Sequence, residues 1–199
     1  MALRKQATDL CVYQIKVTLM GGEPPIWRRI QVTNDTSLQK FHKILQAVMG
    51  WTNSHLHQFV IGGKYFAEPD LEYDPEVENE KLMRLCQVVS GVNDRSIYEY
   101  DFGDNWEHEI LIEKILPVDR GMYYPVCLEG QRACPPEDCG GIQGYIHFLE
   151  AIQKTSHPEH DEMLEWVGGS FDPEAFDLNE INQKIKQSLT TSASEINRL

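Results

Sequence analysis

The spacing of apolar residues changes along this chain, and that change constrains the fold more than any other feature. Up to Leu116, several short segments alternate apolar and polar residues, which is the two-residue period of half-buried strands. After Pro135 the apolar residues recur every three or four positions, the spacing of amphipathic helices. Because strands come first and helices are concentrated at the end, we predict an α+β fold with a mixed or antiparallel sheet built from hairpins.

The first hairpin is predicted over residues 13–32. Apolar residues alternate from Tyr13 to Leu19 and again from Ile26 to Val32, on either side of a turn at Gly21-Gly22. The basic run Trp27-Arg28-Arg29 lies within the second strand, and we interpret it as a solvated strand face because two arginines do not make a phosphate-binding surface.

A helix and a second hairpin should follow. Leu38, Phe41, Leu45 and Val48 have helical spacing, with Thr36 or Ser37 as the N-cap and Gly50 at the C-cap. Residues 57–61 and 65–66 flank a Gly62-Gly63 turn and predict two more strands. The order strand, strand, helix, strand, strand is β-grasp-like by analogy.

A third hairpin holds the densest group of acidic, aromatic and imidazole side chains, in residues 98–108. If Asp104-Asn105 is a two-residue turn, Asp101 lies opposite His108 and can orient its imidazole; a three-residue loop would place Tyr100 there instead. Both registers stay open. Asp101, Asp104 and His108 are therefore candidate catalytic residues, and the alternative is an aromatic core face with Asp104 serving the turn.

The remaining segments complete a single domain over residues 1–199, with a globular core at 10–187. The acidic segment 68–80 contains two prolines and predicts a surface loop, and three helical patterns follow Pro135. Residues 188–199 are polar, and we expect this tail to fray.

The charge of the chain constrains its partners. Its 18 Lys and Arg residues against 31 Asp and Glu give a net charge of -13, which repels phosphate backbones and anionic lipid. We therefore expect a protein or small-molecule partner, with direct nucleic-acid binding disfavoured and no membrane association. Residues 1–10 lack the apolar segment of a signal peptide, so the expected location is cytoplasmic.

His55 and His57 are candidate metal ligands. Two histidines separated by one residue point to the same side of a strand, which makes half of a common metal site. Capping or surface roles are the alternative, since a site needs at least one further ligand.

Three cysteines close together in the sequence extend this hypothesis. Cys127, Cys134 and Cys139 are separated by spacings that differ from the C-x-x-C of a zinc ribbon. If the loop brings them together, His108 or one of the two histidines above could supply a fourth ligand, and the ion would be zinc. The alternative is that the thiols pack as small hydrophobes.

Five motifs together resemble the plasmid pRiA4b ORF-3-like family, from about Tyr13 to about Lys186. They are PIWR (25–28), HLHQF (55–59), YEYDFGDNWEH (98–108), ACPPEDCGG with GY (133–145) and FDPEAF (171–176). The resemblance implies no established activity and no catalytic residues, and the resolvase label on some members does not suit a chain of this charge.

Two functional hypotheses follow. The first is a binding module for a protein or small ligand, because the sequence carries no phosphate-binding loop, dinucleotide fingerprint or recognised hydrolase motif. The second is a metal-dependent hydrolase or nuclease that uses Asp101, Asp104 and His108 beside a histidine and cysteine metal site. We favour the first.

Overall fold

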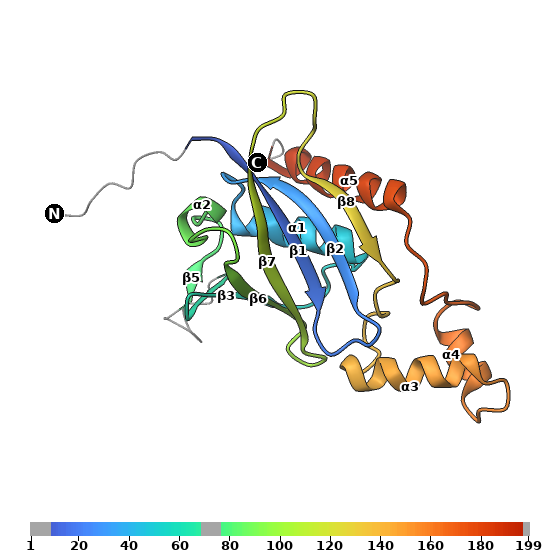
Figure 1. The fold of residues 1–199 in the computed structure, drawn as a ribbon. Helices are drawn as coiled ribbons and strands as arrows, with labels where there is room; N and C mark the ends of the chain where they lie inside the picture. The colour runs from blue at the N-terminus through green and yellow to red at the C-terminus, as the bar shows by residue number, and fades with distance from the viewer. Residues whose placement is uncertain (1–8, 69–76, 197–199) are drawn as a thin grey trace.

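The computed structural model describes residues 9–68 and 77–196. Within them, eight strands form one sheet in the order β5-β4-β3-β6-β7-β1-β2-β8, and neighbours are antiparallel except β4 and β5 (Figure 1). The fold is α+β, as predicted. The strands are β1 (Cys11–Leu19), β2 (Ile26–Thr33), β3 (His57–Ile61), β4 (Lys64–Ala67), β5 (Glu78–Asn79), β6 (Arg95–Tyr100), β7 (Trp106–Pro117) and β8 (Val126–Gln131).

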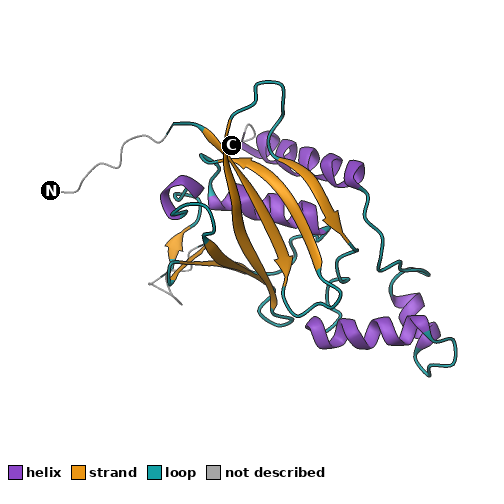
Figure 2. Cartoon of the chain, in the orientation of Figure 1, coloured by secondary structure: helices purple, strands orange, loops and turns teal. Residues whose placement is uncertain are grey.

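Helices cover one face of the sheet and continue beyond its end. They are α1 (Leu38–Met49), α2 (Leu85–Val88), α3 (Gly141–Gln153), α4 (His160–Trp166) and α5 (Leu178–Ile196). Helices α1 and α5 pack against each other behind the strands, whereas α3 and α4 form a separate pair near the end of the sheet (Figure 2). In the described residues, no helix has both the length and the apolar composition needed to cross a membrane.

The caps predicted for the first helix are confirmed in α1. The Ser37 side chain accepts a hydrogen bond from Lys40 N at 3.2 Å, and Gly50 adopts a left-handed conformation with φ 91°. The apolar face of α1 packs on the sheet, where the rings of Phe41 and Phe59 stack 5.8 Å apart. This contact joins the helix to β3, as the strand-strand-helix-strand-strand order requires.

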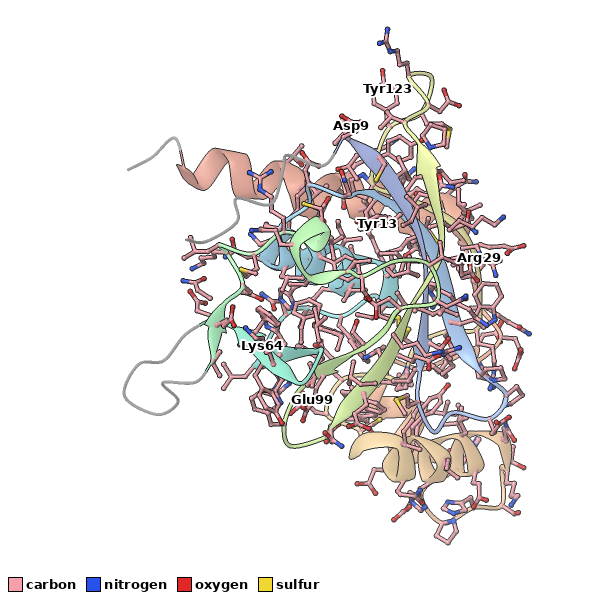
Figure 3. All side chains as sticks on the ribbon, turned by 60° about the vertical axis from the view of Figure 1, so that its left-hand side comes forward. Asp9, Tyr13, Arg29, Lys64, Glu99 and Tyr123 are labelled. Atoms are coloured by element: carbon pink, nitrogen blue, oxygen red, sulfur yellow. The ribbon has the colours of Figure 1, made fainter. Side chains whose placement is uncertain are left out.

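Arg28 differs from the interpretation of its segment as a solvated face. It lies on the same side of β2 as the buried Ile26 and Ile30 and is only 3% exposed. Its guanidinium donates to backbone carbonyls, including Val48 O at 2.9 Å and Arg132 O at 2.8 Å, so its polar atoms are satisfied inside the protein. Arg29, one residue along, faces outward and pairs with Glu113 at 2.6 Å (Figure 3).

Two segments near the predicted boundaries also differ in detail. The expected surface loop 68–80 ends in β5, while its residues 69–76 lie outside the described part of the chain. Helix α5 reaches Ile196 and so includes most of the tail 188–199, whose fraying stays a prediction. Within α5, the side chain of Asn182 donates a hydrogen bond to Cys127 O and accepts one from Cys127 N, both at 2.9 Å. These bonds join the helix to the outer edge of β8.

Candidate functional site

Three loops meet at the end of the sheet near α3. They are the segment before β3, the β6–β7 loop and the loop between β8 and α3. Asp101 N donates to Leu56 O at 2.8 Å, which joins the first two loops. Thr52 Oγ1 donates to a Glu137 carboxylate oxygen at 2.6 Å, which joins the first and third. Backbone and side-chain hydrogen bonds therefore hold the three loops as one unit.

The loop of the β6–β7 hairpin is longer than the two-residue and three-residue loops considered from the sequence. Tyr100 pairs with Trp106 and Tyr98 pairs with His108, so both earlier alternatives for the residue opposite His108 are wrong. Asp101 takes a left-handed conformation with φ 59°, and its Oδ1 accepts Gly103 N at 2.9 Å. This local bond ends the strand early, because an Asx turn replaces strand pairing.

Glycines allow the third loop to approach the hairpin closely. Gly140 N donates to Asp104 Oδ2 at 3.1 Å. A Cβ added to Gly141 would lie 2.4 Å from Asp104 O, and one added to Gly144 would lie 1.8 Å from Cys139 O. A side chain at Gly141 would push the loop away from the hairpin, and one at Gly144 would push α3 away from the preceding loop, since carbon and oxygen need more than 3 Å.

His55, Asp101 and Asp138 converge where the three loops meet. His55 Nε2 lies 3.0 Å from Asp138 Oδ1 and 3.7 Å from Asp101 Oδ2. His55 Nε2 is buried but makes no hydrogen bond within the described structure. The Asp101 side chain is 11% exposed and that of Asp138 is 69% exposed, so the group opens to solvent on one side.

The spacing of these atoms fits a divalent cation. Nitrogen and oxygen ligands lie about 2.0 to 2.2 Å from zinc, which places two ligands about 3.0 Å apart at a right angle and about 3.4 Å apart at the tetrahedral angle. The observed separations of 3.0 and 3.7 Å are close to these values. One imidazole and two carboxylates are donors that suit zinc, manganese or iron.

The other predicted polar residues lie elsewhere. His57 begins β3 and is 2.8 Å from Glu80 Oε2, while its ring stacks on His42 with the centroids 3.4 Å apart. His55 precedes the strand, so the two histidines of the H-x-H pair do not share a site. Asp104 accepts a hydrogen bond from the third loop, and His108 lies on β7 with its side chain completely buried.

Burial keeps two of the imidazoles neutral. His108 Nδ1 lies 3.3 Å from Tyr98 O, and burial lowers the pKa of His108 to about 4. Burial, assisted by the neighbouring His57, lowers the pKa of His42 to about 3. His42 also bonds Tyr98 through the tyrosine hydroxyl at 2.8 Å, so both histidines serve the core beneath the site.

The structure does not bring Cys127, Cys134 and Cys139 to one metal position. No group of three potential ligand atoms within residues 9–68 and 77–196 includes a cysteine. Cys134 Sγ donates a hydrogen bond to Met49 Sδ at 3.6 Å and accepts one from the Arg28 guanidinium at 3.4 Å. Burial raises the pKa of Cys127 to about 11 and that of Cys139 to about 12.

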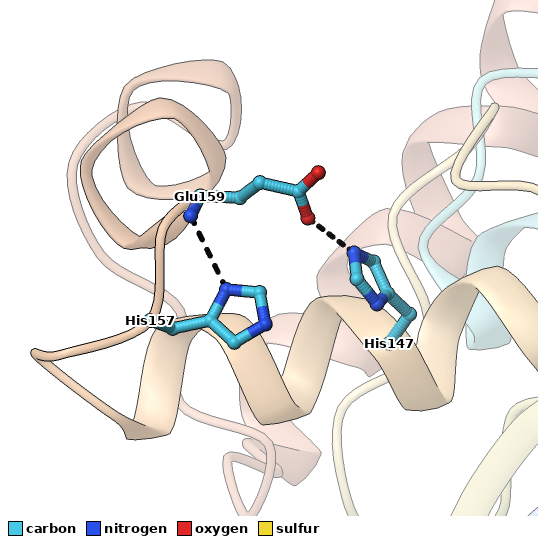
Figure 4. A group of neighbouring side chains, drawn as sticks. All are labelled: His147, His157 and Glu159. Atoms are coloured by element: carbon cyan, nitrogen blue, oxygen red, sulfur yellow. Dashed lines mark hydrogen bonds and ion pairs between the residues drawn. The ribbon is translucent and has the colours of Figure 1, made fainter.

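A second cluster joins α3 to the start of α4. His147 pairs with the Glu159 carboxylate, and His157 Nδ1 accepts a hydrogen bond from Glu159 N at 3.2 Å (Figure 4). A neutral imidazole that accepts at Nδ1 carries its proton on Nε2, so in this arrangement His157 has no lone pair left for a metal. The cluster therefore connects two helices, and we do not assign it as a metal site.

Asp138 is the site residue that the sequence analysis did not select. It lies beside Cys139 in the ACPPEDCGG segment, of which only the cysteines were predicted as ligands. The sequence signal for this residue is an acidic pair one residue before two glycines, because such glycines permit close approach of a loop to another backbone.

Comparison with known proteins identifies relatives over most of the chain. A family model described as "Plasmid pRiA4b ORF-3-like protein" matches residues 11–180. This chain belongs to that family. "Uncharacterized protein y4hQ" of Sinorhizobium fredii is 40% identical to this family member over 176 residues, which is 87% of this chain and 90% of the relative.

A solved structure has the same fold as this chain. It is the "Crystal Structure of Protein of Unknown Function MM3350 from Methanosarcina mazei Go1", with a TM-score of 0.79 and 37% identity. The match covers 86% of this pRiA4b ORF-3-like chain and 97% of the other. The α+β architecture described above is therefore shared with an experimental structure.

Proposed function

We propose that this protein is a ligand-binding module whose ligand is a divalent cation of the zinc class, held by His55, Asp101 and Asp138. The observation that carries the proposal is the convergence of these three donors around a buried Nε2 that lacks a hydrogen bond. His55 Nε2 lies 3.0 Å from Asp138 Oδ1 without forming a hydrogen bond, and a bound cation would accept the nitrogen lone pair between the two carboxylates.

The origin of the three donors supports the same conclusion. His55, Asp101 and Asp138 each come from a different family motif, and the three motifs lie far apart in the sequence. Glycines and an Asx turn bring their loops together at close range. Three protein ligands leave further coordination positions open, as in zinc sites that bind an exchangeable group.

We do not propose the hydrolase or nuclease in the form considered from the sequence. That mechanism needs Asp101, Asp104 and His108 to act together. His108 is fully buried beside Tyr98, and the Asp104 carboxylate accepts the Gly140 N–H, so neither reaches the His55 group as a catalytic partner. From that hypothesis we keep only the bound metal ion.

Elemental analysis and zinc titration test the proposal. Protein purified without a histidine tag or chelator should contain close to one equivalent of metal, and the metal-free protein should bind one Zn²⁺ by calorimetry. His55→Ala and Asp138→Asn should each weaken zinc binding at least about tenfold, because each removes a direct ligand. Circular dichroism confirms that the variants remain folded.

Two further variants show which residues hold the ion. His147→Ala removes the exposed histidine of the second cluster and should leave zinc affinity unchanged. A Cys134→Ser, Cys139→Ser double variant should also retain zinc. Loss of zinc in either variant, with retention in His55→Ala, would reject the site proposed here.

A further inference from the structure

A cleft of about 280 Å³ adjoins the candidate cation site. It lies between the loop before α3 and the helices α3 and α4, and Asp138 lines it. Asp138 thus belongs both to the cation group and to the wall of the cleft. An ion held by His55, Asp101 and Asp138 would sit at the cleft's edge with its open coordination positions available to a ligand.

The far wall of the cleft is aromatic and apolar. It includes Phe148, Met163 and Trp166. The rings of Phe148 and Trp166 meet edge to face with their centroids 5.7 Å apart, and Trp166 is 47% exposed. A half-exposed indole beside a buried phenyl ring forms a surface on which an apolar group can pack.

The charges around the cleft determine which ligands can enter it. Among the residues that line it, Asp138 and Glu162 are acidic and none is Lys or Arg. The whole chain carries a net charge of -13. An anionic ligand would therefore be repelled by the protein alone and attracted only when the cation is present.

The volume of the cleft limits the size of the ligand. A cavity of about 150 Å³ is enough to hold benzene. The cleft has nearly twice that volume, which suits one ring or a short aliphatic chain with a small polar arm. The arm must reach the cation while the apolar body lies against Trp166.

We infer that the cation and the cleft together bind a small carboxylate with an aromatic or aliphatic body. The carboxylate oxygens complete the coordination of the ion next to Asp138, and the apolar body packs on Met163 and Trp166. The inference rests on the proposed cation function and adds the class of ligand that the cation recruits. It makes ligand binding strictly dependent on the metal.

Phenylacetate is a suitable probe, and phenethylammonium is a matched probe of opposite charge. Calorimetry or saturation-transfer NMR on zinc-loaded protein should show phenylacetate binding with a dissociation constant in the millimolar range or tighter, as expected for a ligand of this size. The binding should disappear with EDTA. Phenethylammonium should not bind the zinc-loaded protein.

Variants locate the probe and separate this inference from the cation proposal. Trp166→Ala should weaken phenylacetate binding at least about fivefold, the loss of one aromatic contact, while zinc affinity stays unchanged. Trp27→Ala removes a partly exposed indole from β2 that does not line the cleft, and should change neither. His55→Ala should abolish both zinc and phenylacetate binding.

Each contrary result has a separate meaning. Zinc binding without phenylacetate binding would overturn the ligand inference and leave the cation proposal intact. Phenylacetate binding that persists in EDTA, or that keeps its wild-type affinity in Trp166→Ala, would also overturn the inference, as would preferential binding of phenethylammonium. Failure of the wild-type protein to bind zinc would reject both proposals.

Discussion

Neutral buried histidines are a marked feature of this protein at the scale of single residues. His42 and His108 lie in the core below the three loops, and burial depresses the pKa of both. The unfolded chain holds its histidine protons near the ordinary pKa of about 6.5. Protonation therefore favours the unfolded state as the pH falls below that value.

The depressed pKa values predict a specific loss of stability in acid. Between pH 7.5 and pH 5, His108 should cost about 2 kcal/mol of unfolding free energy, and His42 a similar amount. The loss continues until the pH reaches the folded-state pKa values of about 4 and about 3. Urea unfolding at the two pH values measures it.

A His108→Leu variant isolates one of the two contributions. The substitution has its own cost, but that cost is the same at both pH values and cancels in the difference. The variant should therefore lose about 2 kcal/mol less than the wild type between pH 7.5 and pH 5. An unchanged pH dependence would show that His108 is not kept neutral by burial.

Residues whose role is local were predictable from the sequence. Ser37 and Gly50 cap α1 because capping depends on neighbouring residues in the chain. Arg28 was not predictable as a buried residue, since the acceptors of its guanidinium include Val48 O and Arg132 O in distant segments. Asp138 became recognisable as a site residue only when its distance from His55 was known.

At the scale of elements, two segments position the candidate site. They are the β6–β7 hairpin and the loop between β8 and α3, which lies close against it. The start of α3 approaches this loop so closely that a Cβ on Gly144 would overlap Cys139 O, at 1.8 Å. Asp138 precedes that contact by one residue. Displacement of α3 should therefore move a cation ligand as well as strain the fold.

Gly144→Ala tests this dependence. We expect the free energy of unfolding to fall by about 2 kcal/mol or more, because backbone cannot yield as a flexible side chain can. Zinc affinity should fall at least about tenfold. Gly91→Ala is the matched control, since a Cβ there meets nothing within 4 Å, and its cost should stay within about 0.5 kcal/mol. Equal effects of the two variants would contradict the argument.

Six of the strands and α1 were predictable as elements, but β5 and β8 were not, and neither was the register of the β6–β7 hairpin. Alternation located β1, β2, β3 and β7 because one face of the sheet is buried. The β6–β7 register depended on Asp101, whose left-handed backbone ended β6 two residues before the expected boundary at Phe102. Periodicity carries no information on such a turn.

At the scale of the whole molecule, a bound cation should stabilise the fold. The three proposed ligands come from segments that are more than 30 residues apart in sequence, so unfolding destroys the site. A ligand that binds only the folded state at 100 times its dissociation constant adds about 2.7 kcal/mol. Zinc should accordingly raise Tm by about 5 to 10 °C for a chain of this size.

Calorimetric scans with zinc and with excess EDTA measure this stabilisation. The wild type should lose the increase in Tm with EDTA. His55→Ala should show no increase at any zinc concentration that saturates the wild type, whereas His147→Ala should respond like the wild type. An equal response of His55→Ala would place the stabilising ion elsewhere.

The order of the strands in the sheet could not be predicted from the sequence. β1 pairs with β2 on one side and with β7 on the other. The first pairing follows from adjacency in the chain, but the second joins residues about a hundred positions apart, for example Val17 with Ile110. Local patterns identify the strands without identifying such a partner.

The position of β1 beside β7 has a consequence for synthesis on the ribosome. The hairpin of β1 and β2 is complete at Thr33, but β7 begins only at Trp106. At ordinary translation rates, about 70 further residues take roughly 4 to 14 s. During that interval the nascent hairpin presents an unpaired, apolar strand edge, which makes it the segment of this protein where a chaperone would be of most use.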